Sequence, residues 1–286
     1  MKLGISTYSL HKAFVKGEMT IPDIIRYSAE LGAKHVEIVP LGYSLTGEQA
    51  SWIEEIKQTA AECGIELSNY AIAANFADLD EEATAIEIER VMSEVDVAAR
   101  LGVQKMRFDI AFSTDTSLEH YIQELPRYVA ICQQLADYAL EYNITMSIEN
   151  HGLFVQQSDR VYTLVNRVNR PNFKTTLDVG NFLCVDENPL CAIARNLPIA
   201  SMVHLKDFYY RDKDLQLGDG WFQSTGGNWL RGAIVGQGDL NMPKIIKMIK
   251  MSGYDGFISI EFEGMEDCKL GTKLAFEYVQ RVWDSI

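Results

Sequence analysis

The sequence predicts a single-domain (β/α)8 TIM barrel over residues 1–286, an α/β fold in which eight parallel strands alternate with helices. Two observations favour it: short apolar, β-branched runs alternate with helical patterns, and 286 residues is a usual size for such a barrel. A third is that no low-complexity linker or break in composition divides the chain, which indicates one domain. The candidate strands begin near Leu3, His35, Ile65, Gln104, Ile144, Lys174, Ala200 and Phe257.

The segments between these strands carry helical signals. Apolar residues follow one helix face between Ile88 and Leu101, and again between Leu270 and Val282. Several helical patterns end at a glycine or asparagine, the residues that best adopt the left-handed conformation found just after a helix. These residues are Gly32, Gly64, Gly102, Asn143 and Gly253.

A doubly wound open sheet has the same alternation and is the competing fold. Many such sheets carry a glycine-rich fingerprint between a strand and a helix. The segment GQGDLN at 236–241 has only two of its three glycines and does not follow an obvious strand. We therefore expect the closed barrel.

The composition argues against several classes of protein. Asp and Glu number 40 against 26 Lys and Arg, and the resulting charge of −14 repels nucleic-acid phosphates and anionic lipid headgroups. No apolar run approaches the roughly 20 residues of a membrane-spanning helix, and the N-terminus does not resemble a secretory signal. Five cysteines without a C-x-x-C pair are typical of reduced thiols. We expect a cytoplasmic protein that binds neither nucleic acid nor membrane.

Four residues able to bind a metal end the last four candidate strands: Glu149, Asp178, His204 and Glu261. Because side chains alternate along a strand, Glu149 and Glu261 lie opposite their apolar neighbours, on the face that lines a barrel. In a flat sheet the outermost of four strands would lie roughly 14 Å apart. A curved barrel mouth instead lets the side chains converge at the carboxyl-terminal end, where barrel active sites form.

Three carboxylates and one imidazole form a hard-to-borderline ligand set that suits one divalent metal ion. Mn²⁺ and Mg²⁺ are favoured, and Co²⁺ or Zn²⁺ is the alternative. Any one of the four residues alone is readily explained as a polar group at a loop entrance. Four of them at consecutive strand ends, with matching orientation, predict a site.

Further residues are candidates for substrate contact at this end of the barrel. His151 and Asn181 follow two of the strand ends and either cap a loop or bind a sugar hydroxyl. Lys206 shares the orientation of the seventh-strand histidine and either stabilises an oxyanion or lies in solvent. Arg107, on the fourth strand, either pairs with Glu37, predicted to be buried inside the barrel, or contacts the substrate.

The last two strands begin 57 residues apart, and the chain between them is rich in aromatic residues and glycine at 207–235. Trp221 and its aromatic neighbours predict either a lid over a bound sugar or an interface of a homo-oligomer. Tyr8, after the first strand, either borders the mouth or packs in the core. The loop after the last strand reads EGMED at 263–267, and its charge would repel a phosphate. We therefore expect an unphosphorylated keto sugar or polyol as substrate.

The segments MSIENHG, LDVGN, VHLKD and ISIEFEG resemble those of the xylose isomerase-like TIM barrel superfamily. This superfamily includes ketose 3-epimerases, hydroxypyruvate isomerases, inosose dehydratases and endonuclease IV-type repair enzymes, and the resemblance extends over essentially the whole chain. It implies a divalent-metal-dependent sugar isomerase or epimerase. It also implies that Glu149, Asp178, His204 and Glu261 hold one metal ion, with Glu149 and Glu261 acting as acid and base.

The expected chemistry passes through an enediolate, which forms when a proton leaves the carbon next to a ketone and which a Lewis-acid metal stabilises. Two carboxylates on opposite sides of the sugar would invert a stereocentre, whereas one carboxylate serving both carbons would give aldose–ketose isomerisation. A dehydratase of the inosose type uses the same intermediate and is the first alternative.

Two other functions are less compatible with the sequence. Endonuclease IV-type repair uses three metals and many histidines, whereas this chain has five histidines, and Asn181 stands where that branch is expected to have a ligand histidine. The acidic charge also opposes DNA binding. A non-catalytic sugar-binding barrel is disfavoured because all four candidate ligands are intact.

Overall fold

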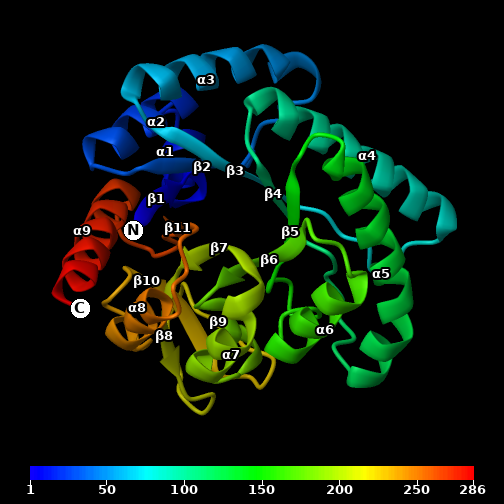
Figure 1. Ribbon diagram of the computed structural model, residues 1–286. Helices are drawn as coiled ribbons and strands as arrows, with labels where there is room; N and C mark the ends of the chain where they lie inside the picture. The colour runs from blue at the N-terminus through cyan, green and yellow to red at the C-terminus, as the bar shows by residue number, and fades with distance from the viewer.

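Eight parallel strands form a closed barrel in the computed structural model, which describes residues 1–286 apart from the side chain of Glu48. Around the barrel the order is β1-β11-β7-β6-β5-β4-β3-β2, so the last strand closes the sheet against the first (Figure 1). The predicted barrel is confirmed, and each strand begins within one residue of its expected start. The barrel strands are β1 (Lys2–Ser6), β2 (His35–Ile38), β3 (Glu66–Ile72), β4 (Lys105–Phe108), β5 (Thr145–Glu149), β6 (Phe173–Asp178), β7 (Ala200–Leu205) and β11 (Phe257–Ile260).

Helices surround the barrel on its outside (Figure 1). The two amphipathic segments predicted at 88–101 and 270–282 lie in α4 and α9. Among the described residues, no helix has both the length and the apolar composition needed to cross a membrane. The α-helices are α1 (His11–Val15), α2 (Ile21–Glu30), α3 (Trp52–Cys63), α4 (Glu81–Leu101), α5 (Leu118–Leu140), α6 (Ser158–Val168), α7 (Pro189–Asn196), α8 (Met242–Met251) and α9 (Cys268–Ser285). The short 3-10 helices are η1 (Thr7–Leu10), η2 (Gly47–Ser51), η3 (Asn181–Val185) and η4 (Leu197–Ile199).

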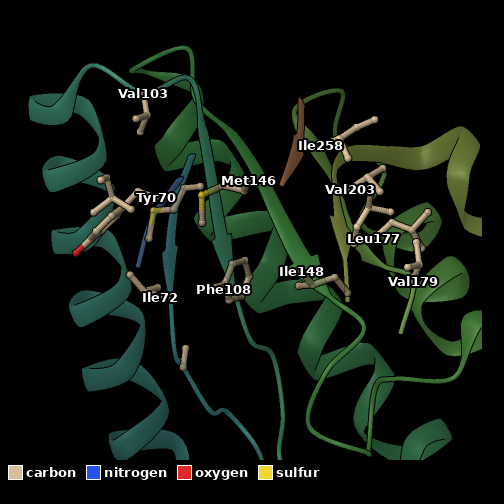
Figure 2. Close-up of a cluster of buried hydrophobic side chains, with 14 of the residues drawn as sticks. Tyr70, Ile72, Val103, Phe108, Met146, Ile148, Leu177, Val179, Val203 and Ile258 are labelled. Carbon is tan, nitrogen blue, oxygen red and sulfur yellow. The ribbon is translucent and has the colours of Figure 1, made fainter. Parts of the chain in front are cut away.

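The hydrophobic core lies between the outer face of the sheet and the helices. Met146 and Ile148 of β5 belong to this core, where they gather with Phe108 of the neighbouring strand (Figure 2). The intervening Ser147 and Glu149 bind polar partners, as the predicted alternation requires. Burying an apolar side chain of this size contributes about 1.5–3 kcal/mol. The outer layer therefore stabilises the barrel and leaves its interior available for polar groups.

The predicted helix ends are confirmed by the backbone conformation. Gly64 and Gly102 follow α3 and α4 directly, with φ angles of 62° and 80° in the left-handed region. Asn143 has the same kind of conformation, with φ 57°, in the turn between α5 and β5. A residue with a branched side chain would be strained at these positions. These residues therefore end each helix and direct the chain into the next strand.

The chain between β7 and β11 adds a small antiparallel sheet to the barrel. Its strands are β8 (Asp207–Arg211), β9 (Phe222–Gln223) and β10 (Trp229–Ala233), in the order β8-β10-β9. Two carboxylates, the exposed Asp186 and the buried Asp207, stabilise this segment through hydrogen bonds. Asp186 accepts hydrogen bonds from Ser224, Gly226 and Asn228, and Asp207 accepts from the backbone of residues 236, 238 and 240.

Candidate active site

Four ligand-type side chains meet at the carboxyl-terminal end of the barrel. Glu149, Asp178, His204 and Glu261 are buried, and one ligand atom of each lies within 4.8 Å of the others. Asp178 and His204 are direct partners in the register of β6 and β7, and Glu261 follows the last residue of β11. The curvature of the barrel thus brings together residues from β5 to β11, as the sequence predicts.

The imidazole of His204 is oriented by a carboxylate on the opposite side of the ring. Its Nε2 lies 2.9 Å from Oε2 and 3.1 Å from Oε1 of Glu37. Because a carboxylate only accepts hydrogen bonds, Nε2 carries the proton and Nδ1 of the neutral ring is a lone-pair donor. Nδ1 points to the cluster, 3.5 Å from Oε1 of Glu261 and 3.7 Å from Oε2 of Glu149.

Three of the four candidate ligands have a buried atom without a hydrogen-bond partner among the described residues: Oδ2 of Asp178, Nδ1 of His204 and Oε2 of Glu261. The two oxygens have only the ammonium group of Lys206 nearby, at 3.4 and 2.6 Å. The other carboxylate oxygen of Asp178 accepts from the backbone amides of Gly180 and Asn181, at 2.7 and 2.9 Å. A buried polar atom without a partner is costly. Carboxylate oxygens and an imidazole nitrogen that lack hydrogen bonds and converge on one point fit a divalent cation.

Crowding of ionisable groups shifts two pKa values strongly in the metal-free protein. Burial raises the pKa of Asp178 to about 7, although the nearby Lys206 opposes this. Burial lowers the pKa of His204, but the charges of Glu37 and Glu261 outweigh it and raise that pKa to about 10. At neutral pH His204 is therefore protonated and Asp178 is protonated in part, and a bound cation would displace these protons.

Both oxygens of Glu149 are held by neighbouring side chains. Nε of Arg107 lies 2.6 Å from Oε2, and Nδ2 of Asn181 donates to Oε1 at 3.0 Å. Arg107 also pairs with Asp109 at 2.9 Å. The predicted pairing of Arg107 with Glu37 is wrong, because β5, the strand next to β4, brings Glu149 to the guanidinium while β7 supplies His204 to Glu37.

Lys206 holds the carboxylate of Glu261. Its Nζ lies 2.6 Å from Oε2 of Glu261, 3.4 Å from Oδ2 of Asp178 and 3.3 Å from Oε2 of Glu263. The side chain is buried among these three carboxylates. The alternative that placed Lys206 in solvent is therefore wrong, and its role in stabilising an oxyanion stays a prediction.

A cavity of about 190 Å³ opens above this cluster. One wall is charged and the other, formed by the ends of β2 and β3 and the loop after β2, is largely apolar. Its lining residues are Tyr8, Val39, Pro40, Leu41, Ala71, Ala73, Arg107, Asp109, Glu149, His151, His204, Lys206, Glu261 and Glu263. A larger depression of about 670 Å³ lies near the starts of β1, β3, β4 and β11, at the opposite end of the barrel from the cluster.

Two candidate substrate contacts, His151 and Asn181, differ in their access to the cavity. His151 lines it, with Nδ1 held 3.0 Å from Oδ1 of Asp109. Asn181 is buried behind the cavity wall. Its Nδ2 donates to Glu149, and its Oδ1 lies 3.4 Å from Nζ of Lys206. Its geometry is that of a residue that positions Glu149.

Trp221 is not among the described residues that line the cavity. Its ring lies under the guanidinium groups of Arg211 and Arg231, at 5.9 and 5.1 Å from the ring centroid. The segment predicted as a lid forms its own sheet, which removes this aromatic ring from the cavity. Trp221 therefore does not border the cavity above the four candidate ligands, and its contact with a substrate stays a prediction.

The sequence alone gives little or no indication that three further residues line the cavity. Asp109 lies two residues after Arg107 and holds both that guanidinium and His151. The alternation of side chains along β4 was a signal that could have identified it. Tyr8 does border the mouth, and its hydroxyl donates to Oε1 of Glu263 at 2.7 Å. Glu263 was predicted only as part of a negatively charged loop.

The chain belongs to the xylose isomerase-like TIM barrel family, whose model matches residues 25–282. Three solved structures have a similar fold. The probable 3-DHS dehydratase AsbF of Bacillus anthracis is 19% identical, with a TM-score of 0.76 over 98% of this chain and 99% of that chain. A D-psicose 3-epimerase, solved in the presence of D-fructose, is 16% identical, with a TM-score of 0.72 over 99% of each chain. A xylose isomerase-like TIM barrel protein of Mycobacterium smegmatis in complex with magnesium is 18% identical, with a TM-score of 0.69 over 92% of this chain and 88% of that chain.

Proposed function

We propose that the protein is a divalent-metal-dependent isomerase or epimerase of a keto sugar or polyol. The observation that carries this proposal is the convergence of four buried ligand groups, three of them with an atom that has no hydrogen bond, beneath a cavity. Glu149, Asp178, His204 and Glu261 are the proposed ligands, and Mg²⁺ or Mn²⁺ is the proposed ion. The magnesium complex of the similar Mycobacterium smegmatis protein supports this choice.

The proposed reaction moves a proton to and from carbon through an enediolate. When bound, the cation would supply Lewis-acid stabilisation of the negative charge that develops on the substrate oxygens. Glu149 and Glu261 come from strands separated by β6 and β7, so they approach a substrate from different directions. One carboxylate would accept the proton and the other would return a proton to the opposite face, which inverts a stereocentre.

The surrounding residues would keep these two carboxylates in position. Arg107 and Asn181 hold Glu149, and Lys206 holds Oε2 of Glu261, so each carboxylate has little freedom to rotate. Such orientation lowers the entropic part of the barrier. We propose that Arg107, Lys206 and Asn181 act mainly in this way, and that His151 binds a substrate hydroxyl.

Proton exchange provides the test. The protein loaded with Mn²⁺ or Mg²⁺ is incubated in heavy water with ketoses, inososes and small hydroxyketones, and deuterium incorporation is followed by NMR. Glu149→Gln and Glu261→Gln should each abolish incorporation, while circular dichroism shows an intact fold. Exchange that persists in either variant would remove that residue from the proposed mechanism.

A dehydratase is the second candidate, and the environment of His151 favours it. A base would remove a proton from the carbon next to the carbonyl. The hydroxyl group on the following carbon would then accept a proton and leave as water. His151 lines the cavity, and Asp109 accepts from its Nδ1. Burial lowers the pKa of His151, but the hydrogen bond and charge of Asp109 outweigh it and raise that pKa, which favours the imidazolium form. In that form Nε2 also carries a proton and would donate it to the leaving group. Mass spectrometry of the product separates the two functions, because dehydration removes one water and epimerisation leaves the mass unchanged.

A further inference from the structure

Both permanently charged cations of the cavity are already paired with carboxylates of the protein. Arg107 contacts Asp109 and Glu149 at 2.9 and 2.6 Å. Lys206 contacts Glu261 at 2.6 Å and Glu263 at 3.3 Å. A phosphate or carboxylate on a substrate would have to displace one of these buried pairs, which leaves a protein carboxylate without its partner.

Glu263 is the most exposed carboxylate of the cavity wall. Its side chain is 41% exposed, whereas that of Glu261 is 10% exposed. Its two oxygens face Tyr8 and Lys206, and it lines the same cavity as the apolar Val39 and Leu41. If the reacting carbons of a substrate lie over the four candidate ligands, the part of the substrate nearest the cavity opening would therefore contact Glu263.

Contacts on two sides restrain the backbone at Glu263. On one side, Gly232 of β10 packs so closely that a Cβ there would lie 2.3 Å from the carbonyl oxygen of Glu263. On the other, Nζ of Lys12 donates to the carbonyl oxygen of Gly264 at 2.5 Å. The carboxylate is consequently presented from a fixed loop, and the antiparallel sheet supports that loop.

We propose that Glu263 determines substrate specificity: it accepts hydrogen bonds from hydroxyl groups on the outer part of the substrate and excludes substrates that carry an anionic group there. The inference rests on the proposed function, because that function places the reacting carbons of the substrate at the four candidate metal ligands. A carboxylate accepts hydrogen bonds from hydroxyls but repels another anion, and the repulsion is stronger in a partly enclosed cavity than in bulk water. Discrimination of this kind depends on the unfavourable contact as much as on the favourable one.

The experiment compares two ligands of matched structure, D-fructose and D-fructose 6-phosphate. Their dissociation constants are measured by calorimetry on the full-length, Mg²⁺-loaded protein. The wild type should bind D-fructose more tightly. In Glu263→Gln, which keeps the size of the side chain and an acceptor for Tyr8, the preference should shift toward the phosphate by about tenfold. Glu277→Gln is the control, because it makes the same charge change on the outer helix α9, where Glu277 pairs with Lys273.

Two results would overturn the inference: equal or tighter binding of the phosphate by the wild type, or a shift in Glu263→Gln no larger than in Glu277→Gln. Failure to bind either ligand would overturn it as well. Failure of the proposed function has a different signature, in which D-fructose binds with the expected preference but no ketose in the screen exchanges deuterium. The binding and exchange measurements together therefore distinguish the two failures.

Discussion

Oε2 of Glu37 lies 2.9 Å from Nε2 of His204, and both side chains are fully enclosed by the barrel. This contact joins β2 to β7 across the interior of the barrel. It also determines which ring nitrogen of the histidine faces the other three candidate ligands. A carboxylate behind a ligand histidine orients the ring and raises its basicity. Glu37 is therefore part of the candidate metal site although it lies outside the group of four ligands.

Replacing Glu37 by glutamine should weaken metal binding about 10- to 100-fold. The amide can still meet Nε2 through its oxygen, but it lacks the negative charge that favours the protonated Nε2 and the free Nδ1. Mn²⁺ titration followed by calorimetry measures the change. Asp137→Asn, at an exposed ion pair with Arg170, serves as the control for a lost carboxylate. Unchanged affinity in Glu37→Gln would show that His204 is not a ligand through Nδ1.

The stabilisation by metal should increase with pH. The folded pKa of His204 is about 10, above its ordinary value of 6.5, so the stability it contributes to the metal-free protein is complete below 6.5 and is lost toward pH 10. The folded pKa of Asp178, about 7, is also raised, so its ionisation costs stability as pH rises from about 4 to 7. The metal binds the deprotonated forms.

The melting temperature is therefore expected to fall with rising pH without metal, and to fall less with saturating Mg²⁺. Scanning calorimetry between pH 6 and 9, at constant ionic strength, gives the difference between the two curves. A metal-dependent increase in melting temperature that is the same throughout this range would contradict the assignment of His204 and Asp178 as ligands.

Arg107→Met should destabilise the metal-free protein by about 3–5 kcal/mol, because Asp109 and Glu149 then remain buried without their partner. Denaturant unfolding provides the measurement. Arg170→Met removes an exposed pair with Asp137 and should cost no more than about 1 kcal/mol. Similar losses in the two variants would mean that the enclosed pair at Glu149 is not a structural requirement.

Gly232→Ala should displace the loop that carries Glu263. The added methyl group would lie 2.3 Å from the carbonyl oxygen of Glu263, so the backbone must move. We expect D-fructose to bind about three- to tenfold more weakly. Gly218→Ala, in the same segment but with open space around the new Cβ, is the control and should bind normally. Equal affinities in both variants would show that the antiparallel sheet does not support the site.

The fold and the four candidate ligands follow from local features of the sequence. Each strand is recognised from a short apolar run, and glycine or asparagine marks helix ends such as Gly64 and Asn143. The alternation of side chains then assigns Glu149 and Glu261 to the barrel interior. These signals lie within a few residues of one another, which is why they can be read without knowledge of the tertiary structure.

The partners of those ligands depend on contacts between distant parts of the chain. Arg107 meets Glu149 and not Glu37, Trp221 lies away from the cavity, and Glu263 faces Tyr8, 255 residues away in the sequence. The alternation of side chains along a strand predicts which face of the sheet a residue occupies, but not which residue it contacts. That choice depends on strand tilt, register and the path of the long connections, which only the closed and packed barrel determines.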